Sequence, residues 1–240
     1  MLVRVTAVLA LFCFAIAAYE IYDNEMQKRA AEVEKPTAAT MPPSASATEQ
    51  PFVSPIDFEA LCKGVPDAIA WLTIDGTKID YPVVQTDDNQ FYVHNSAEKK
   101  ASKYGAVFLD FRNHGDFSDF YNIIYAHNMA NGSMFGTLVR FKQKDFFDRV
   151  QTGTLNTPTH DYELQIFACS VTNSTSDYYQ SIAFLSPAEK ESHLAYLKKT
   201  AKYWRDITIG NDDRIVILST CSYEFDEART VVLAKLVETA

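Results

Sequence analysis

Cysteine is scarce in this sequence. Its four residues, Cys13, Cys62, Cys169 and Cys221, are spread over 240 positions, and no two of them form a C-x-x-C pair. This spacing supports neither a zinc site nor a disulfide framework. If the three cysteines beyond Cys13 lie outside the cell, their odd number leaves at least one free thiol. The sequence leaves open whether Cys62 and Cys169 pair.

The sequence has fewer positive than negative charges, and it has no internal repeats. Lys and Arg number 22 against 31 Asp and Glu, so the net charge is −9, and nucleic acid is not expected as a partner. No segment recurs along the chain, which argues against a repeat architecture. The hydrophobic share of 47% and the charged share of 22% are ordinary for a folded protein. A chain of this length can form one domain with a substantial core.

Residues 1–22 carry a targeting signal. Val5–Tyr19 contains no charged residue, and the run counted from Leu2 spans roughly 27 Å as a helix, near the thickness of a bilayer core. Arg4 precedes the run and acidic residues follow it, so the rest of the chain is expected outside the cell. Ala15-Ile16-Ala17 also fits a signal-peptide cleavage site, so the residues alone leave a retained anchor and a cleaved signal peptide open.

Residues 23–51 have a different composition. The first part, up to Lys35, is polar and could extend the N-terminal helix, and Pro36–Pro51 is rich in Pro, Ala, Thr and Ser. Such a composition is typical of a linker without a core. We therefore expect a stalk over 23–51 and a folded domain over 52–240.

The folded part reads as many short strands with few helices. Asp75-Gly76 is a hairpin turn signal between two β-branched and aromatic runs. The pattern favours a β-barrel or sandwich with added helices. Strands are expected at 71–74, 78–81, 106–109, 122–126, 152–155, 163–171 and 215–218, and helices at 56–63, 87–94 and 136–147.

A longer helix is expected over Ser186–Arg205. Ser186 can cap it, Pro187 suits its first position, and Glu189 completes a capping box. Leu194, Leu197, Ala201 and Trp204 then share one face, which is typical of a packed supporting helix.

The most informative stretch lies near the C-terminal end. Ile215–Leu218 is an apolar run that suits a buried strand, and Cys221 follows just past its end. After a polar loop, Arg229 stands at the start of a second apolar run. If the two strands pair, the thiol and the guanidinium can face each other, and nearby positive charge favours the nucleophilic thiolate. From this stretch alone, a buried and inert cysteine fits equally well.

A second apolar strand ends at His127. The run Asn122–Ala126 precedes it and a polar loop follows, and side chains at such strand ends are often presented for catalysis. The other histidines stand in polar or helical surroundings and are expected at the surface; they are His94, His114, His160 and His193.

With His127, Cys221 and Arg229 identified, the chain resembles the sortases, and more narrowly the class B sortases. The resemblance covers roughly residues 56–237. It rests on a histidine motif, a cysteine motif, an arginine loop and an opening hairpin, at Ile124–Met129, Leu218–Cys221, Tyr223–Asp226 with Arg229, and Trp71–Gln85. One departure is Ala126, which stands where many members have Gly.

The resemblance implies an eight-stranded sortase-type β-barrel with N-terminal helices and a long helix before the cysteine strand. It favours a retained membrane anchor with the catalytic domain on the outer face of a Gram-positive cell. The implied enzyme is a transpeptidase with His127, Cys221 and Arg229 as catalytic residues and with no metal or organic cofactor. Its implied partners are surface proteins with a C-terminal sorting motif, and a cell-wall peptide or its lipid-linked precursor as amine acceptor.

Two other functions remain open at this point. A cysteine peptidase of the same chemistry would let water replace the accepting amine. An anchored binding module would carry Cys221 as a structural residue only.

Overall fold

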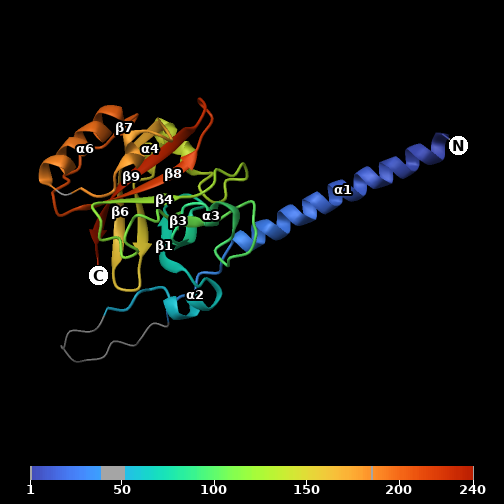
Figure 1. The fold of residues 1–240 in the computed structure, drawn as a ribbon, viewed down its shortest axis with the longest axis horizontal. Coiled ribbons are helices and arrows are strands. Elements are labelled where there is room, and N and C mark those ends of the chain that lie inside the picture. Colours follow the sequence, from blue (N-terminus) through green and yellow to red (C-terminus); the bar gives the residue numbers. More distant parts are fainter. Residues whose placement is uncertain (1, 39–51, 185, 240) are drawn as a thin grey trace.

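The computed structural model describes residues 2–38, 52–184 and 186–239. It contains one long N-terminal helix, several shorter helices and a set of strands of which β6 and β9 are the longest (Figure 1). The helices are α1 (Leu2–Ala31), α2 (Phe58–Gly64), α3 (Phe91–His94), the 3₁₀ helix η1 (Leu138–Lys142), α4 (Lys144–Arg149), α5 (Asp177–Gln180) and α6 (Pro187–Thr200). The strands are β1 (Ala68–Ile74), β2 (Asp80–Val84), β3 (Val107–Leu109), β4 (Tyr121–Tyr125), β5 (Thr152–Asn156), β6 (Asp161–Asn173), β7 (Tyr203–Trp204), β8 (Arg214–Cys221) and β9 (Ala228–Glu238).

Eight of these strands close into a barrel. They are hydrogen-bonded in the order β5-β1-β2-β3-β4-β8-β9-β6, and β5 pairs with β6 to complete the ring. The two-residue β7 lies outside the ring and pairs only with β6. The sheet is mixed, because β2–β3 and β4–β8 are parallel and the other pairs are antiparallel. The predicted eight-stranded barrel with added helices is confirmed.

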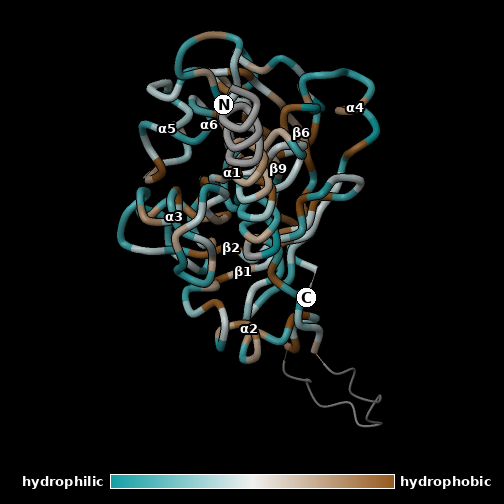
Figure 2. The backbone as a smooth tube through the Cα atoms, turned by 90° about the vertical axis from the view of Figure 1, so that its right-hand side faces the viewer, coloured by the Kyte–Doolittle hydropathy of each residue, from teal (hydrophilic) through white to brown (hydrophobic). Residues whose placement is uncertain are grey.

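Strand β8 is buried on both of its faces, which explains why it is a nearly continuous apolar run. Val216 and Leu218 point into the barrel interior, whereas Ile215 and Ile217 pack outside it with residues of α5 and α6. Figure 2 shows hydrophobic positions gathered toward the middle of the molecule and mostly hydrophilic loops around them. A third cluster packs α2 and α3 against the outer face of β1, β2 and β3.

The opening hairpin forms at the predicted turn. β1 and β2 pair antiparallel on either side of it, and Gly76 has φ +67°, a left-handed conformation that glycine adopts without a steric penalty. Asp80 on β2 accepts hydrogen bonds from the Trp71 ring nitrogen (2.6 Å) and the Thr73 hydroxyl (2.8 Å) on β1. These cross-strand contacts fix the register of the hairpin.

The long helix begins as predicted but ends earlier. The Ser186 side chain and the Glu189 side chain form the expected reciprocal capping box. The helix stops at Thr200, so the expected range up to Arg205 was too long. After Ala201, the backbone hydrogen bonds of Lys202 and Arg205 go to Cys169 and Phe167 of β6, and this segment forms β7 instead of a further helical turn.

Two other sequence-based expectations need correction. Residues 136–147 form two short helices rather than one, because Gln143 is extended at φ −93° and ψ 126° and interrupts the helical hydrogen bonds. His193 is not a simple surface residue, since its ring packs among Tyr121, Phe184 and Tyr196. Burial lowers the pKa of His193 to about 4.

The N-terminal helix projects from the barrel, and its C-terminal end is the end that meets the barrel (Figure 1). Gln27 accepts a hydrogen bond from the backbone N–H of Lys103 (3.1 Å), and Ala31 is buried against the barrel core. Lys35, beyond the helix, pairs with Asp80 (3.2 Å). The division at residue 52 stays a prediction, but part of the expected stalk contacts the folded domain. Within the described residues, no helix has both the length and the apolar character to cross a bilayer.

These contacts lead to a prediction about truncation. A chain that starts at residue 52 is expected to remain soluble and active, yet to unfold about 5 °C below a chain that starts at residue 23. The reason is that only the longer chain keeps the burial of Ala31 and the Lys35–Asp80 ion pair. Thermal unfolding followed by circular dichroism gives both midpoints. Equal midpoints would mean that residues 23–51 do not stabilise the barrel.

Candidate active site

The parallel pairing of β4 with β8 brings His127 and Cys221 to one edge of the sheet. Tyr125 lies opposite Ser219 at the end of the paired register, so His127 and Cys221 each follow two residues later. Hydrogen bonds continue past the strand ends, from the Thr220 hydroxyl to Ala126 O (2.8 Å) and from Asn128 Nδ2 to Cys221 O (3.0 Å). The sequence-predicted histidine and cysteine are therefore neighbours.

The antiparallel pairing of β8 with β9 adds Arg229. Cys221 and Arg229 are direct register partners, as expected if the two strands paired. Side chains alternate between the two faces of a strand, so Cys221 lies on the same face as Ile215 and Ile217, and Arg229 on the same face as Val231. This is the outer face of the barrel, on the side of α5 and α6.

The three side chains line one pocket of about 380 Å³. Cys221, His127 and Arg229 are each half-buried, which suits groups that must be both held in place and reached by a substrate. The remaining wall residues come from five separate regions of the chain; they are Asn89, Gln90, Val93, Phe108, Tyr125, Ala126, Ser174, Tyr179, Ser219 and Thr220.

The His127 ring is held by α3. Its Nε2 lies 2.8 Å from Val93 O, and because a carbonyl oxygen only accepts, Nε2 is the donor. Gly105, at φ +60°, packs against this arrangement. A β-carbon there would lie 2.6 Å from Tyr92 O and 3.0 Å from His127 Cδ2, so only glycine fits. These contacts orient the imidazole without using Nδ1.

The Arg229 guanidinium lies at the rim of the pocket. Its Nη1 donates to Ala228 O (3.1 Å) and its Nη2 to the Glu227 carboxylate (3.0 Å). The Glu227 side chain is 66% exposed, so solvent weakens this ion pair. Two contacts use only part of the five-donor capacity of a guanidinium. Across the described residues, no group of three or more His, Cys, Asp or Glu side chains could hold a metal ion.

The chain is similar to proteins of a known family. A family model described as the sortase domain matches residues 72–237, which is most of the chain. The sortase B of Listeria monocytogenes is 37% identical over 173 residues, covering 71% of this chain and 70% of that protein. The chain belongs to the class B sortases.

Solved structures of class B sortases have the same fold. A Streptococcus pyogenes class B sortase involved in pilus biogenesis is 35% identical at a TM-score of 0.68, covering 75% of this chain and 98% of its own. A Staphylococcus aureus sortase B–substrate complex is 28% identical at a TM-score of 0.71, covering 76% of this chain and 85% of its own. The resemblance inferred from four sequence motifs is thus confirmed over the whole barrel.

Sequence reasoning missed most of the pocket wall of this sortase. Tyr125 and Ser219 could have been found, because each stands two residues before a predicted site residue on the same strand face. Tyr179, which reaches the pocket from α5, gave no such signal. Its place depends on how the β6–α6 connection folds back over the barrel.

The other cysteines of the sortase differ from Cys221 in accessibility. All four are free thiols, which answers the question of a Cys62–Cys169 pair. Cys169 is fully buried in the barrel interior, and burial raises the pKa of its thiol to about 12. Cys62 is exposed, with its sulfur near Ala68 O (3.9 Å).

This contrast predicts the alkylation pattern of the native protein. Iodoacetamide at neutral pH is expected to modify Cys221 and Cys62 and to leave Cys169 unmodified, because the buried thiol is both inaccessible and protonated. Peptide mass spectrometry measures the modification of each site. In urea, Cys169 should react as fast as Cys62. Rapid labelling of Cys169 in the folded protein would contradict its placement in the core.

Proposed function

We propose that this class B sortase cleaves a C-terminal sorting motif after its Thr, holds the protein as a thioester on Cys221, and transfers it to an amine of the cell wall. The observation that carries the proposal is the common pocket of a thiol, an imidazole and a guanidinium, positioned by the registers of β4, β8 and β9. These groups supply a nucleophile, a proton carrier and an oxyanion donor.

In the acylation step, the Cys221 thiolate attacks the threonine carbonyl carbon, and the carbon–nitrogen bond of the scissile peptide breaks. His127 gives a proton to the leaving amine. Since Nε2 is engaged by Val93 O, we assign this transfer to Nδ1. Arg229 donates hydrogen bonds to the developing oxyanion, a task that its planar set of donors suits.

In the transfer step, the amine of a cell-wall peptide or its lipid-linked precursor attacks the thioester carbonyl. The carbon–sulfur bond breaks, the thiolate of Cys221 returns, and His127 takes the proton released by the amine. The proton that His127 gives to the leaving amine is thus replaced by the proton that it takes from the attacking amine. No metal or organic cofactor takes part in either step.

Membrane attachment belongs to the same proposal. Its support is the charge-free run Val5–Tyr19, together with the projection of α1 away from the barrel and the exposure of large apolar side chains on it, such as Phe14 at 73% and Tyr19 at 69%. Because Arg4 precedes the run and acidic residues follow it, attachment at this end would place the catalytic domain on the outer face of the cell. Alkaline extraction of membranes should release a chain that starts at residue 23 and retain the full chain.

The test of the activity uses quenched peptides in which one position is fixed as Thr. The peptide cleaved fastest is selected, and intact-mass measurement should show an acyl adduct on Cys221. With an added amine, the amide product should form at the expense of the acid. Acid formation that is unaffected by the amine would identify a hydrolytic peptidase. The absence of any adduct across the set would favour a binding module.

A further inference from the structure

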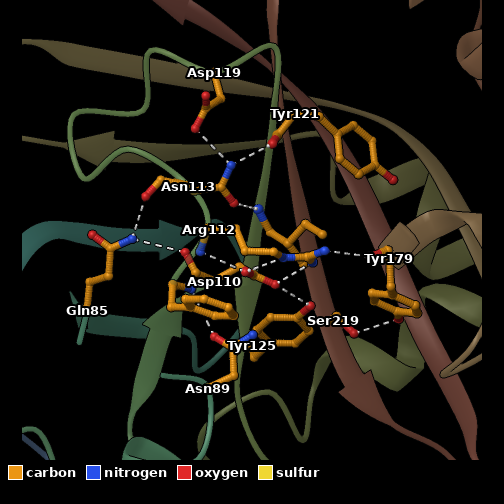
Figure 3. A network of polar contacts seen from close by, with 12 residues as sticks. Gln85, Asn89, Asp110, Arg112, Asn113, Asp119, Tyr121, Tyr125, Tyr179 and Ser219 are labelled. Carbon is orange, nitrogen blue, oxygen red and sulfur yellow. Dashed lines mark hydrogen bonds and ion pairs between the residues drawn. The ribbon is translucent and has the colours of Figure 1, made fainter. Parts of the chain in front are cut away.

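The loop from Asp110 to Phe120, between β3 and β4, is fixed to the barrel by short hydrogen bonds. Gln85, directly after β2, donates to Asp110 O (3.0 Å) and Asn113 O (2.7 Å). The Asn113 amide is buried and donates to Asp119 (3.0 Å) and Tyr121 O (2.8 Å) (Figure 3). These hydrogen bonds hold the loop in place, and with it the side chains of the loop.

Asp110 and Arg112 form a bidentate ion pair in this loop. Asp110 is fully buried, and its two carboxylate oxygens accept from Arg112 Nε (2.9 Å) and Nη2 (2.8 Å). The Tyr125 hydroxyl donates to the same carboxylate (3.0 Å). Burial raises the pKa of Asp110, but the hydrogen bonds from Arg112 outweigh it and leave the pKa below its usual value. A buried carboxylate with this set of partners is ionised and held in one position.

Arg112 extends from this pair to the pocket wall. Its Nη1 donates to Tyr179 O (3.0 Å), and the Tyr179 hydroxyl is hydrogen-bonded to Ser219 Oγ (2.8 Å) (Figure 3). The rings of Tyr179 and Tyr125 stack with centroids 6.2 Å apart. Tyr179 is thus held at its main chain by Arg112 and at its hydroxyl by β8, and Tyr125, Tyr179 and Ser219 all line the pocket.

The helix α5, which carries Tyr179, depends on contacts with the rest of the protein for its stability. α5 has only four residues, and a helix of one turn has no stability of its own. Tyr178 is held from the other side by the hydroxyls of Ser170 (2.7 Å) and Thr200 (3.0 Å). Without Arg112, α5 would therefore stay folded against α6, but the main chain of Tyr179 would lose its tie to the β3–β4 loop.

We propose that Asp110 and Arg112 are positioning residues that hold the Tyr179 wall of the pocket and thereby set the affinity for the acyl-donor peptide. This inference rests on the proposed function. Neither residue lines the pocket, and no contact joins either one to Cys221, His127 or Arg229 among the interactions of the described chain. Loss of the pair should therefore weaken peptide binding and leave the chemical step nearly unchanged.

The test compares Arg112→Gln and Arg112→Lys with the parent, using the quenched Thr peptide that the parent cleaves fastest. Lysine keeps the positive charge beside Asp110. Its single ammonium group cannot donate to both carboxylate oxygens of Asp110 and also reach Tyr179 O. Both variants are expected to raise KM about 10-fold, in line with the loss of a charge-assisted hydrogen bond, and to change kcat by less than about 3-fold. The Lys variant keeps the test usable if the Gln variant unfolds.

Arg214→Gln is the matched control. Arg214 also pairs with a carboxylate, Glu238 (3.3 Å), and contacts a tyrosine hydroxyl, that of Tyr162 (3.1 Å), but it lies at the opposite end of β8 from Cys221. It should leave KM unchanged, with a smaller cost in stability, because the Glu238 side chain is 49% exposed whereas Asp110 is fully buried. All variants are therefore assayed at a temperature at which each of them is folded. The alkylation rate of Cys221 by iodoacetamide should be the same in all variants, because this small reagent does not need the tyrosine wall.

The outcomes separate this inference from the proposed function. A parent enzyme that cleaves none of the Thr peptides would contradict both the proposed function and the positioning role. A parent that cleaves, with Arg112 variants whose KM is unchanged or whose kcat alone falls, would overturn only the positioning role. An equal rise of KM in Arg214→Gln would also overturn it, because the effect would then reflect general loss of stability.

Discussion

Replacing Cys221 with alanine is expected to lower both peptide cleavage and amine transfer below detection, a loss of more than about 10⁴-fold. No other free thiol lines the pocket among the described residues, so no second nucleophile can substitute. The fold should persist, because Cys221 is half-buried at a strand end and a single small side chain contributes little there. Cleavage of the selected Thr peptide and thermal unfolding are the two measurements.

Cys169→Ala is the informative control for this prediction. Cys169 lies inside the barrel, so its loss should cost about 1 kcal/mol of stability and keep most activity. Cys62→Ala, at an exposed position, should affect neither activity nor stability. A folded Cys221→Ala protein that still cleaves would show that the thiol is not the nucleophile.

Replacing Arg229 with lysine is expected to be nearly as damaging as replacing it with alanine. Losing one donor to an oxyanion typically costs about 100- to 1,000-fold in turnover. Lysine keeps the charge but cannot present two parallel N–H groups in one plane. The rate of thioester formation in Arg229→Lys, Arg229→Ala and the parent measures the effect, at temperatures where all three are folded.

The structure makes a rival explanation of Arg229 concrete. Its guanidinium pairs with Glu227 at the loop surface, and an exposed ion pair contributes about 0–1 kcal/mol. If this pairing were its whole role, both substitutions would cost little, and Glu227→Gln would mimic them. A Lys variant within a few-fold of the parent would instead leave only a role as a positive charge. Strong losses in both Arg229 variants, with a mild Glu227→Gln, would support the oxyanion role.

The sequence predicted most of the barrel because its strands alternate or run apolar in ways that local physics determines. The Asp75-Gly76 turn and the Ser186 cap were readable for the same reason, since each depends on neighbouring residues only. The end of α6 could not be predicted from the sequence. Nothing within residues 200–205 shows that their backbone groups will pair with β6, so a long-range contact decided a local structure.

In the candidate site, too, some features follow from the local sequence and others from long-range contacts. Cys221, His127 and Arg229 stand at strand ends that the apolar pattern marks, and the register then brings them together. Arg112 lies in the β3–β4 loop and Tyr179 on the one-turn helix α5, and their positions follow from hydrogen bonds to residues far away in the chain. Composition and periodicity carry no information about such contacts, so the wall of the pocket became visible only in the structure.

The parallel pairing of β4 with β8 has a consequence for how activity appears during synthesis. Thr220 and Ala126, which that pairing joins, are 94 residues apart, and β8 and β9 follow all other strands in the chain. A nascent chain that has exposed only β1–β6 carries His127 but neither Cys221 nor Arg229 beside it. Contacts at such separation form late because they need the closure of a long loop. We therefore expect the proposed reactive centre of Cys221, His127 and Arg229 to assemble only when the barrel closes, after the rest of the chain has been made.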